Sequence, residues 1–288
     1  MFQGSLVALI TPLENGRVDY KKIAELVEFQ IAGGTDALVP VGSTGESSTV
    51  DVAEHEKIIE TVIKAADGRL PVIPGTGGNA TAEALELTRF ARKAGATATL
   101  QVCPYYNKPT QEGLYRHFAT IAEKVDLPIV LYNVPGRTAV SLAPATVARL
   151  AKIENIVAIK EASGSMDQTS EILSLCDITV LSGDDSLTLP LMSIGAKGVI
   201  SVAANIVPKD VHDLTAAALK GDYAGAAVLH RKLFPLCRAM FFETNPIPVK
   251  TAAGLMGLCS PEMRLPLCEM SPAARKQLEQ VMKEYGLI

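Results

Sequence analysis

Short apolar runs recur along the chain, and each is followed by a turn and then by a longer stretch with helical periodicity. Eight such runs can be located: SLVALI (5–10), ALVPV (37–41), PVIPG (71–75), TATLQV (97–102), PIVLY (128–132), IVAIK (156–160), ITVLS (178–182) and GVISV (198–202). Runs of this length bounded by turns are typical of strands. Because they are continuously apolar, they predict a parallel sheet that is covered on its outer face.

The stretches between the runs are amphipathic, with apolar residues returning at i, i+3, i+4 and i+7. Clear examples are residues 20–34, 51–66, 81–95 and 111–125. Eight strands that alternate with helices predict an α/β protein with a (β/α)₈ barrel, the TIM-barrel fold. An open, doubly wound sheet is the alternative. Such a sheet usually carries G-x-G-x-x-G after its first strand, and TPLENGR (11–17) is not this turn.

Three further helical patterns follow the eighth unit, over residues 223–242, 245–258 and 271–286. The last pattern opens with Ser271 as a potential N-cap and Pro272 at the first helical position. No low-complexity tract or charge block precedes them. We therefore predict a barrel over residues 1–222 and a helical appendage over residues 223–288, packed on the barrel.

The composition and charge disfavour several classes of partner. The chain is 48% hydrophobic and 20% charged, as in ordinary globular proteins. A net charge of −4 offers no basic surface for nucleic acid or for an anionic membrane. The first apolar run is too short to span a bilayer and has no basic residue ahead of it.

Cysteines and histidines show no ligand or disulfide pattern. The five cysteines are odd in number and contain no C-x-x-C pair, which suits a reducing cytoplasm: Cys103, Cys176, Cys237, Cys259 and Cys268. The four histidines are scattered without metal-ligand spacing: His55, His117, His212 and His230. We expect no metal cofactor.

Unusual residues follow the apolar runs, which is where a barrel places its active site. They are GSTGES (42–47), GTGGN (75–79), CPYYNKP (103–109), NVPGRT (133–138), Lys160-Glu161 and GDDS (183–186). Most have ordinary structural interpretations. Tyr105 and Tyr106 are typical of interface packing, Arg137 of a solvated loop, and His55 of a helix surface. GDDS suits a helix N-terminus.

Lys160 differs, because it ends an otherwise apolar strand. The end of a barrel strand points into the mouth rather than toward bulk water. Burial disfavours the ammonium form, so the free amine becomes available as a nucleophile. Condensation with a ketone gives an imine and then an enamine, which attacks a second carbonyl; this is class I aldol chemistry without a metal. Neighbouring Glu161 points the other way and is predicted to be structural.

Proton transfers must accompany these steps, and a buried tyrosine with hydroxyl neighbours can relay them. Tyr132, Thr44 and Tyr106 are the available groups. Backbone N–H groups in GSTGES can hold a small carboxylate, and an arginine can bind another. These features predict a keto-acid donor and an acidic acceptor.

The motifs GSTGES, CPYYNKPTQEGLYRHF, YNVPGRT, IKEASG and SGDD together resemble the dihydrodipicolinate synthase family of bacterial lysine and diaminopimelate biosynthesis, over almost the whole chain. The resemblance implies a Schiff base between pyruvate and Lys160, with no other cofactor. It implies that Tyr132, Thr44 and Tyr106 relay protons and that Arg137 binds the carboxylate of aspartate semialdehyde.

The resemblance also implies that Ser43, Gly183 and Ile200 help to line the pocket. In the family, a relay tyrosine is lent across a subunit contact, so a homotetramer built from tight dimers is implied. Many members are inhibited by lysine at this contact. The matching positions here are Ser48, His55, Asn79, Glu83 and Tyr105, whereas Val52 replaces a histidine of some sensitive members. We expect weak to moderate inhibition.

Two other functions remain open. Ser43 stands where the family more often has threonine, and GSTGE is also common in N-acetylneuraminate lyases, which share the lysine and the tyrosine. Arg137 and KEASG favour the synthase over a sugar-acid pyruvate aldolase. The second alternative is a non-catalytic phosphate-binding barrel. GDDS argues against it, because two carboxylates after strand seven would repel phosphate.

Overall fold

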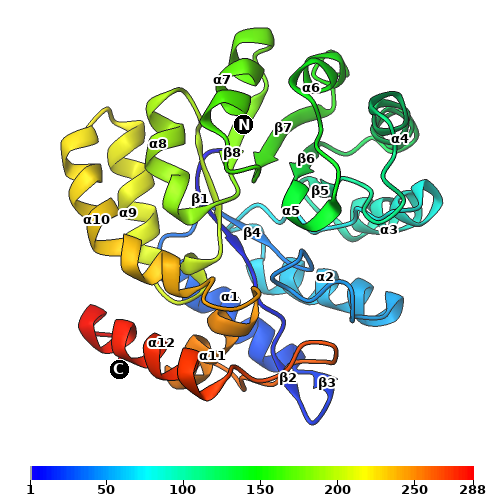
Figure 1. The fold of residues 1–288 in the computed structure, drawn as a ribbon. Helices are drawn as coiled ribbons and strands as arrows, with labels where there is room; N and C mark the ends of the chain where they lie inside the picture. Colours follow the sequence, from blue (N-terminus) through cyan, green and yellow to red (C-terminus); the bar gives the residue numbers. More distant parts are fainter. Residues whose placement is uncertain (1) are drawn as a thin grey trace.

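The computed structural model describes residues 2–288, and it confirms the predicted (β/α)₈ barrel with helices around a parallel sheet (Figure 1). The strands are hydrogen-bonded in the order β4-β1-β9-β8-β7-β6-β5. Their bounds are β1 Gly4–Ala8, β4 Ala37–Val39, β5 Thr99–Val102, β6 Ile129–Asn133, β7 Ile156–Glu161, β8 Thr179–Ser182 and β9 Gly198–Ser201. A small antiparallel hairpin, β2 (Leu13–Glu14) and β3 (Arg17–Val18), follows β1.

The third apolar run, residues 71–75, closes the barrel without forming a regular strand. Isolated parallel bridges join it to β4 and to β5. Leu38 N donates to Pro71 O (2.9 Å), and Leu100 N donates to Pro74 O (2.9 Å). Proline has no N–H to donate, so the two prolines interrupt the ladder from their own side. The predicted strand lies at the expected place in the barrel, but it forms isolated bridges instead of a continuous ladder.

Helices cover the outer face of the barrel (Figure 1). Their bounds are α1 Tyr20–Ala32, α2 Val52–Ala66, α3 Thr81–Ala94, α4 Gln111–Lys124, α6 Pro144–Leu150, α7 Met166–Leu175, α8 Thr188–Ser193 and α9 Pro208–Leu219. Three shorter turns lie in the loops: α5 Pro135–Thr138 and the 3₁₀ helices η1 Asp185–Leu187 and η2 Ala203–Asn205. Within residues 2–288, none of the helices is long and apolar enough to cross a bilayer.

The helix ends follow from the local sequence. Asp51 caps α2, accepting a hydrogen bond from Glu54 N (2.8 Å), while the Glu54 carboxylate accepts one from Asp51 N (3.4 Å). This reciprocal pair is a capping box. α3 ends at Gly95, whose φ of +94° lies in the left-handed region that glycine adopts without strain. The capping box at Asp51 therefore fixes the end of the loop that leads from β4 into α2.

Three helices follow α9: α10 Tyr223–Ala239, α11 Ile247–Leu255 and α12 Pro272–Tyr285. α12 begins as predicted, with Ser271 Oγ accepting from Ala274 N (3.4 Å) and proline at the first position. α10 packs on α9 and α12, and α11 packs on α12. Figure 1 shows α11 and α12, in orange to red, beside α1 and the β2–β3 hairpin.

The barrel interior holds its own apolar cluster, separate from the larger core that contains most of the buried helix side chains. Its members are Leu6, Ala8, Ala37, Val39, Ile73, Ala98, Leu100, Val130, Tyr132, Val134, Ala158, Leu181 and Ile200. Side chains two residues apart on a strand share a face. Lys160 therefore follows Ala158 on the interior side of β7.

Candidate active site

Lys160 lies at the carboxyl end of the barrel with only 5% of its surface exposed. Tyr132 on β6 is its neighbour in register, and Lys160 Nζ lies 4.4 Å from the centroid of the Tyr132 ring. A cation over an aromatic face is attracted by the ring. The predicted burial of Lys160 is confirmed, and the structure places its amine beside the predicted relay tyrosine.

The loop after β8 brings a carboxylate into the electrostatic field of this amine. Burial raises the pKa of Asp184, and the nearby Lys160 ammonium acts in the opposite direction. Asp185 has a different task, because its Oδ2 accepts hydrogen bonds from Val202 N and Ala203 N (both 2.9 Å) and so fixes the loop after β9. Sequence reasoning singled out this loop but assigned Asp184 no role near the lysine.

Glu161 points away from the barrel mouth, as predicted. Its carboxylate accepts hydrogen bonds from Asn133 Nδ2 (3.0 Å), Ser163 N (2.7 Å) and Gln168 Nε2 (3.2 Å). A buried carboxylate with this many donors is satisfied where it stands. Glu161 is therefore a structural residue that ties β7 to β6 and to α7.

The two hydroxyls of the loop after β4 lie in different surroundings. Ser43 lines a cavity of about 430 Å³ that also contacts Arg137 and Asn245. Thr44 is buried, and its Oγ1 accepts a hydrogen bond from Asn245 Nδ2 (3.0 Å). Among residues 2–288, the backbone N–H groups of Ser43 and Thr44 have no hydrogen-bond partner. Adjacent free N–H groups of this kind can bind a small carboxylate.

Arg137 reaches the same cavity from α5, directly after β6. Its Nη2 donates a hydrogen bond to Asn245 O (3.0 Å), and the rest of the guanidinium remains exposed. Asn245 therefore joins Thr44 and Arg137. Its Oδ1 is buried and has no partner among the described residues. Sequence reasoning missed Asn245, because it precedes a helix in the appendage and carries no local signal of a site.

Three other predicted site residues lie as follows. Tyr106 is 90% exposed and has a φ of +70°, whereas Lys160 is buried, so within one chain Tyr106 points to solvent. Like Lys160, Tyr132 and Thr44, it is not among the residues that line the cavity. Ile200 is fully buried on β9, in the same interior cluster as Tyr132. Gly183 is required by packing, since a Cβ there would lie 2.5 Å from the Ala162 Cβ.

Only some of the predicted regulatory residues lie together in the structure. Four of them lie on the wall of the same cavity: Ser48, His55, Glu83 and Tyr105. Asn79 is not on that wall, and its backbone carbonyl accepts from Asn107 Nδ2 (2.8 Å). The expected surface position of His55 is wrong: it is buried, its Nε2 donates to Gly75 O (2.8 Å), and burial lowers its pKa.

Residues 2–288 contain no cluster of three or more His, Cys, Asp or Glu side chains arranged to hold a metal ion. The chemistry available at the barrel mouth is that of an amine, a tyrosine hydroxyl, a carboxylate and free backbone N–H groups. A (β/α)₈ barrel with one buried lysine beside a tyrosine at its carboxyl end has the layout of a lysine-dependent aldolase.

Comparison with known proteins narrows this class. The model of the dihydrodipicolinate synthetase family matches residues 1–285, and the chain belongs to that family. The curated 4-hydroxy-tetrahydrodipicolinate synthase of Geobacter sulfurreducens is 60% identical over the full length of both chains. The crystal structure of dihydrodipicolinate synthase from Aquifex aeolicus superposes with a TM-score of 0.98 at 54% identity, covering 99% of each chain. The Acinetobacter baumannii synthase, solved in complex with pyruvate, gives a TM-score of 0.98 at 47% identity over the full length of both chains.

Proposed function

We infer that this chain is a lyase that condenses pyruvate with L-aspartate 4-semialdehyde to 4-hydroxy-tetrahydrodipicolinate, in lysine and diaminopimelate biosynthesis. The observation that carries this inference is the buried Lys160 amine beside Tyr132. The identity of 60% over the whole chain to a curated synthase supports the choice of acceptor over a sugar. The protein uses no cofactor, because the covalent imine supplies the electron sink.

The reaction begins when the uncharged Lys160 Nζ attacks C2 of pyruvate. Loss of water from the carbinolamine leaves a protonated imine, whose positive charge lies in the electrostatic field of Asp184. Loss of a C3 proton gives the enamine, and its C3 bonds to the aldehyde carbon of the second substrate. The resulting alkoxide takes up a proton. Attack by the substrate amino group on C2 then closes the ring and returns Lys160 as free amine.

The remaining groups bind the substrates and move protons. The free N–H groups of Ser43 and Thr44 hold the pyruvate carboxylate. Tyr132 transfers protons at the imine, with Thr44 and Tyr106 completing the relay. Arg137 binds the carboxylate of the semialdehyde with the donors that Asn245 leaves free.

Trapping with borohydride tests the proposal. Pyruvate and borohydride together should increase the mass of the protein, and peptide mapping should place the adduct on Lys160. Aspartate semialdehyde or N-acetylmannosamine is then supplied as acceptor while pyruvate loss is followed. Consumption with only the sugar would favour the sugar-acid aldolase, and absence of any adduct would favour a non-catalytic phosphate-binding barrel.

Replacing Arg137 with Ala is expected to raise KM for aspartate semialdehyde about 10- to 100-fold, because a charge-assisted bond to its carboxylate is lost. The rate of pyruvate trapping should stay unchanged, since this guanidinium serves only the acceptor. Steady-state kinetics with each substrate varied in turn measure the difference. Arg137→Lys keeps the charge but not the bidentate geometry, so its KM for aspartate semialdehyde should lie between those of wild type and Arg137→Ala. Equal effects on both substrates would contradict the assignment.

We propose that the protein assembles as a homotetramer of two tight dimers, in which the second copy covers exposed apolar side chains near the cavity. These are Val52 (64% exposed), Tyr105 (40%) and Tyr106 (90%). A contact there would bring Tyr106 of one copy toward the active site of the other. Sedimentation velocity should show a tetramer with no substantial monomer. The reducing cytoplasm is its proposed location, which suits five cysteines without a disulfide.

Lysine should inhibit the enzyme weakly to moderately, by binding where the cavity meets the proposed dimer contact. Ser48, His55 and Glu83 line that part of the wall, and exposed Val52 offers an apolar group where some sensitive relatives have a histidine. The carboxylate of Glu83 attracts the ligand's ammonium group. Initial rates with lysine at millimolar concentration measure the effect. An unchanged rate would remove this proposal.

A further inference from the structure

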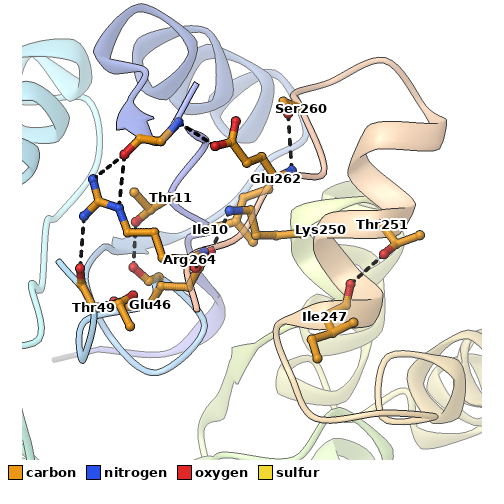
Figure 2. Close-up of polar contacts among 12 residues, drawn as sticks. Ile10, Thr11, Glu46, Thr49, Ile247, Lys250, Thr251, Ser260, Glu262 and Arg264 are labelled. Atoms are coloured by element: carbon orange, nitrogen blue, oxygen red, sulfur yellow. Dashed lines mark hydrogen bonds and ion pairs between the residues drawn. The ribbon is translucent and has the colours of Figure 1, made fainter. Parts of the chain in front are cut away.

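A buried ion pair joins the appendage to the loop after β4. Lys250 Nζ on α11 lies 2.5 Å from Glu46 Oε1, and the two side chains are 0% and 2% exposed (Figure 2). Burial lowers the pKa of Lys250, while the Glu46 carboxylate acts in the opposite direction. A buried pair is on average no more stabilising than apolar side chains of the same volume. Its presence therefore calls for a reason other than stability.

Glu46 ends the turn that carries the two free N–H groups. Its own N–H donates to Ser43 O (3.2 Å), and its carbonyl accepts from Thr49 N (3.0 Å). Its φ of +56° lies in the left-handed region, which a residue with a side chain occupies only when its surroundings hold it there. The conformation of the turn at Ser43 and Thr44 therefore depends on what holds Glu46.

The groups that hold the Glu46 carboxylate come from the appendage. Besides Lys250 at Oε1, Arg264 N donates to Glu46 Oε2 (3.3 Å). The Arg264 guanidinium also donates to Thr49 O (3.0 Å), on the far side of the turn (Figure 2). No barrel side chain donates to the Glu46 carboxylate among residues 2–288. The Glu46 carboxylate is thus held from outside the barrel, whereas the barrel itself contacts the turn through Thr11 Oγ1, which donates to Gly45 O (2.7 Å).

We propose that Lys250 and Glu46 form a positioning pair, which holds the Ser43–Glu46 turn so that its free N–H groups receive the carboxylate of the keto-acid donor. Neither residue has a part in the proposed reaction steps; the Lys250 side chain is fully buried, and the Glu46 carboxylate is engaged by Lys250 and Arg264. The inference rests on the proposed function and deepens it. It says that the affinity for pyruvate depends on a residue pair that takes no part in the reaction steps.

The decisive variant is the double substitution Glu46→Gln/Lys250→Met. It removes both charges while nearly keeping the volumes, so the fold should survive, and the melting temperature should stay within a few degrees of wild type. KM for pyruvate should rise about tenfold or more, because a displaced turn no longer presents both N–H groups. KM for aspartate semialdehyde should change less than about twofold. Steady-state kinetics and borohydride trapping at low pyruvate give these values.

A matched control removes an ion pair that also joins the appendage to the barrel but lies away from the loop. Lys232 on α10 contacts Asp210 on α9, with 2.8 Å between Nζ and Oδ2. Asp210→Asn/Lys232→Met should leave both KM values unchanged. Glu46→Asp, which keeps both charges but shortens the carboxylate, covers the case in which the first double variant does not fold. A raised pyruvate KM in it supports the proposal, and an unchanged one contradicts it.

The other outcomes are equally informative. A folded Glu46→Gln/Lys250→Met protein with wild-type pyruvate KM would overturn this inference alone. The same holds if both KM values rise together with a large loss of melting temperature, since that result indicates a purely structural pair. If the wild-type protein forms no adduct with pyruvate, the proposed function fails first, and the positioning role fails with it.

Discussion

Lys160→Met is expected to abolish the condensation, with kcat/KM falling about 10⁴-fold or more, because no other group can form the imine. Borohydride should no longer fix pyruvate to the protein. The fold should persist, since a thioether chain of similar length replaces an amine that lies over the Tyr132 ring beside apolar neighbours. A continuous assay of pyruvate loss and intact-protein mass spectrometry measure the two effects.

Lys160→Arg is the matched control for charge. It keeps a cation beside Asp184, but a guanidinium does not form the imine, so it should be as inactive as the Met variant. Activity in the Arg variant would mean that the cation alone accounts for the role of Lys160. Pyruvate trapped on a different lysine in either variant would contradict the assigned nucleophile.

Tyr132→Phe is expected to lower kcat about 10²- to 10³-fold, the range for loss of a group that transfers protons in the transition state. The ring that lies against Lys160 remains, so the substitution removes only the hydroxyl. Pyruvate should still be trapped, but more slowly, because both addition and dehydration need a proton at the right atom. Single-turnover trapping rates and kcat together distinguish this from a binding defect.

Tyr105→Phe is the control for losing a tyrosine hydroxyl from the cavity that Ser43 and Arg137 line. Tyr105 is half-exposed on the cavity wall, and the proposed reaction does not use it. Its kcat should stay within about twofold of wild type. If the two Phe variants behave alike, the hydroxyl of Tyr132 has no special part in proton transfer.

The fold was predictable because the pattern repeats. Continuous apolar runs separated by amphipathic stretches leave few arrangements other than a covered parallel barrel. Lys160 stood out for the same reason, as a single amine in a run that is otherwise buried. The third run shows the limit of such patterns: apolar residues predicted a strand, whereas Pro71 and Pro74 interrupt the ladder that would make it regular.

The site was predictable only where its residues follow strands. Which of the adjacent hydroxyls of Ser43 and Thr44 faces the cavity depends on the turn conformation, which no residue type in that loop specifies. Asn245 is 201 residues from its partner Thr44, and Lys250 is 204 residues from Glu46. Neither belongs to a local motif. In the proposed assembly, the place of Tyr106 depends on a second copy of the chain.

The anchoring of the loop by Asn245, Lys250 and Arg264 has a consequence for the order of synthesis. All the strands of the barrel leave the ribosome before these three residues do, so a nascent barrel can close around Lys160 while the Ser43–Glu46 turn still lacks its contacts to the appendage. A chain arrested before residue 245 would carry the nucleophile without a competent keto-acid site. On the proposed function, only polypeptides that are nearly full length are expected to bind pyruvate well.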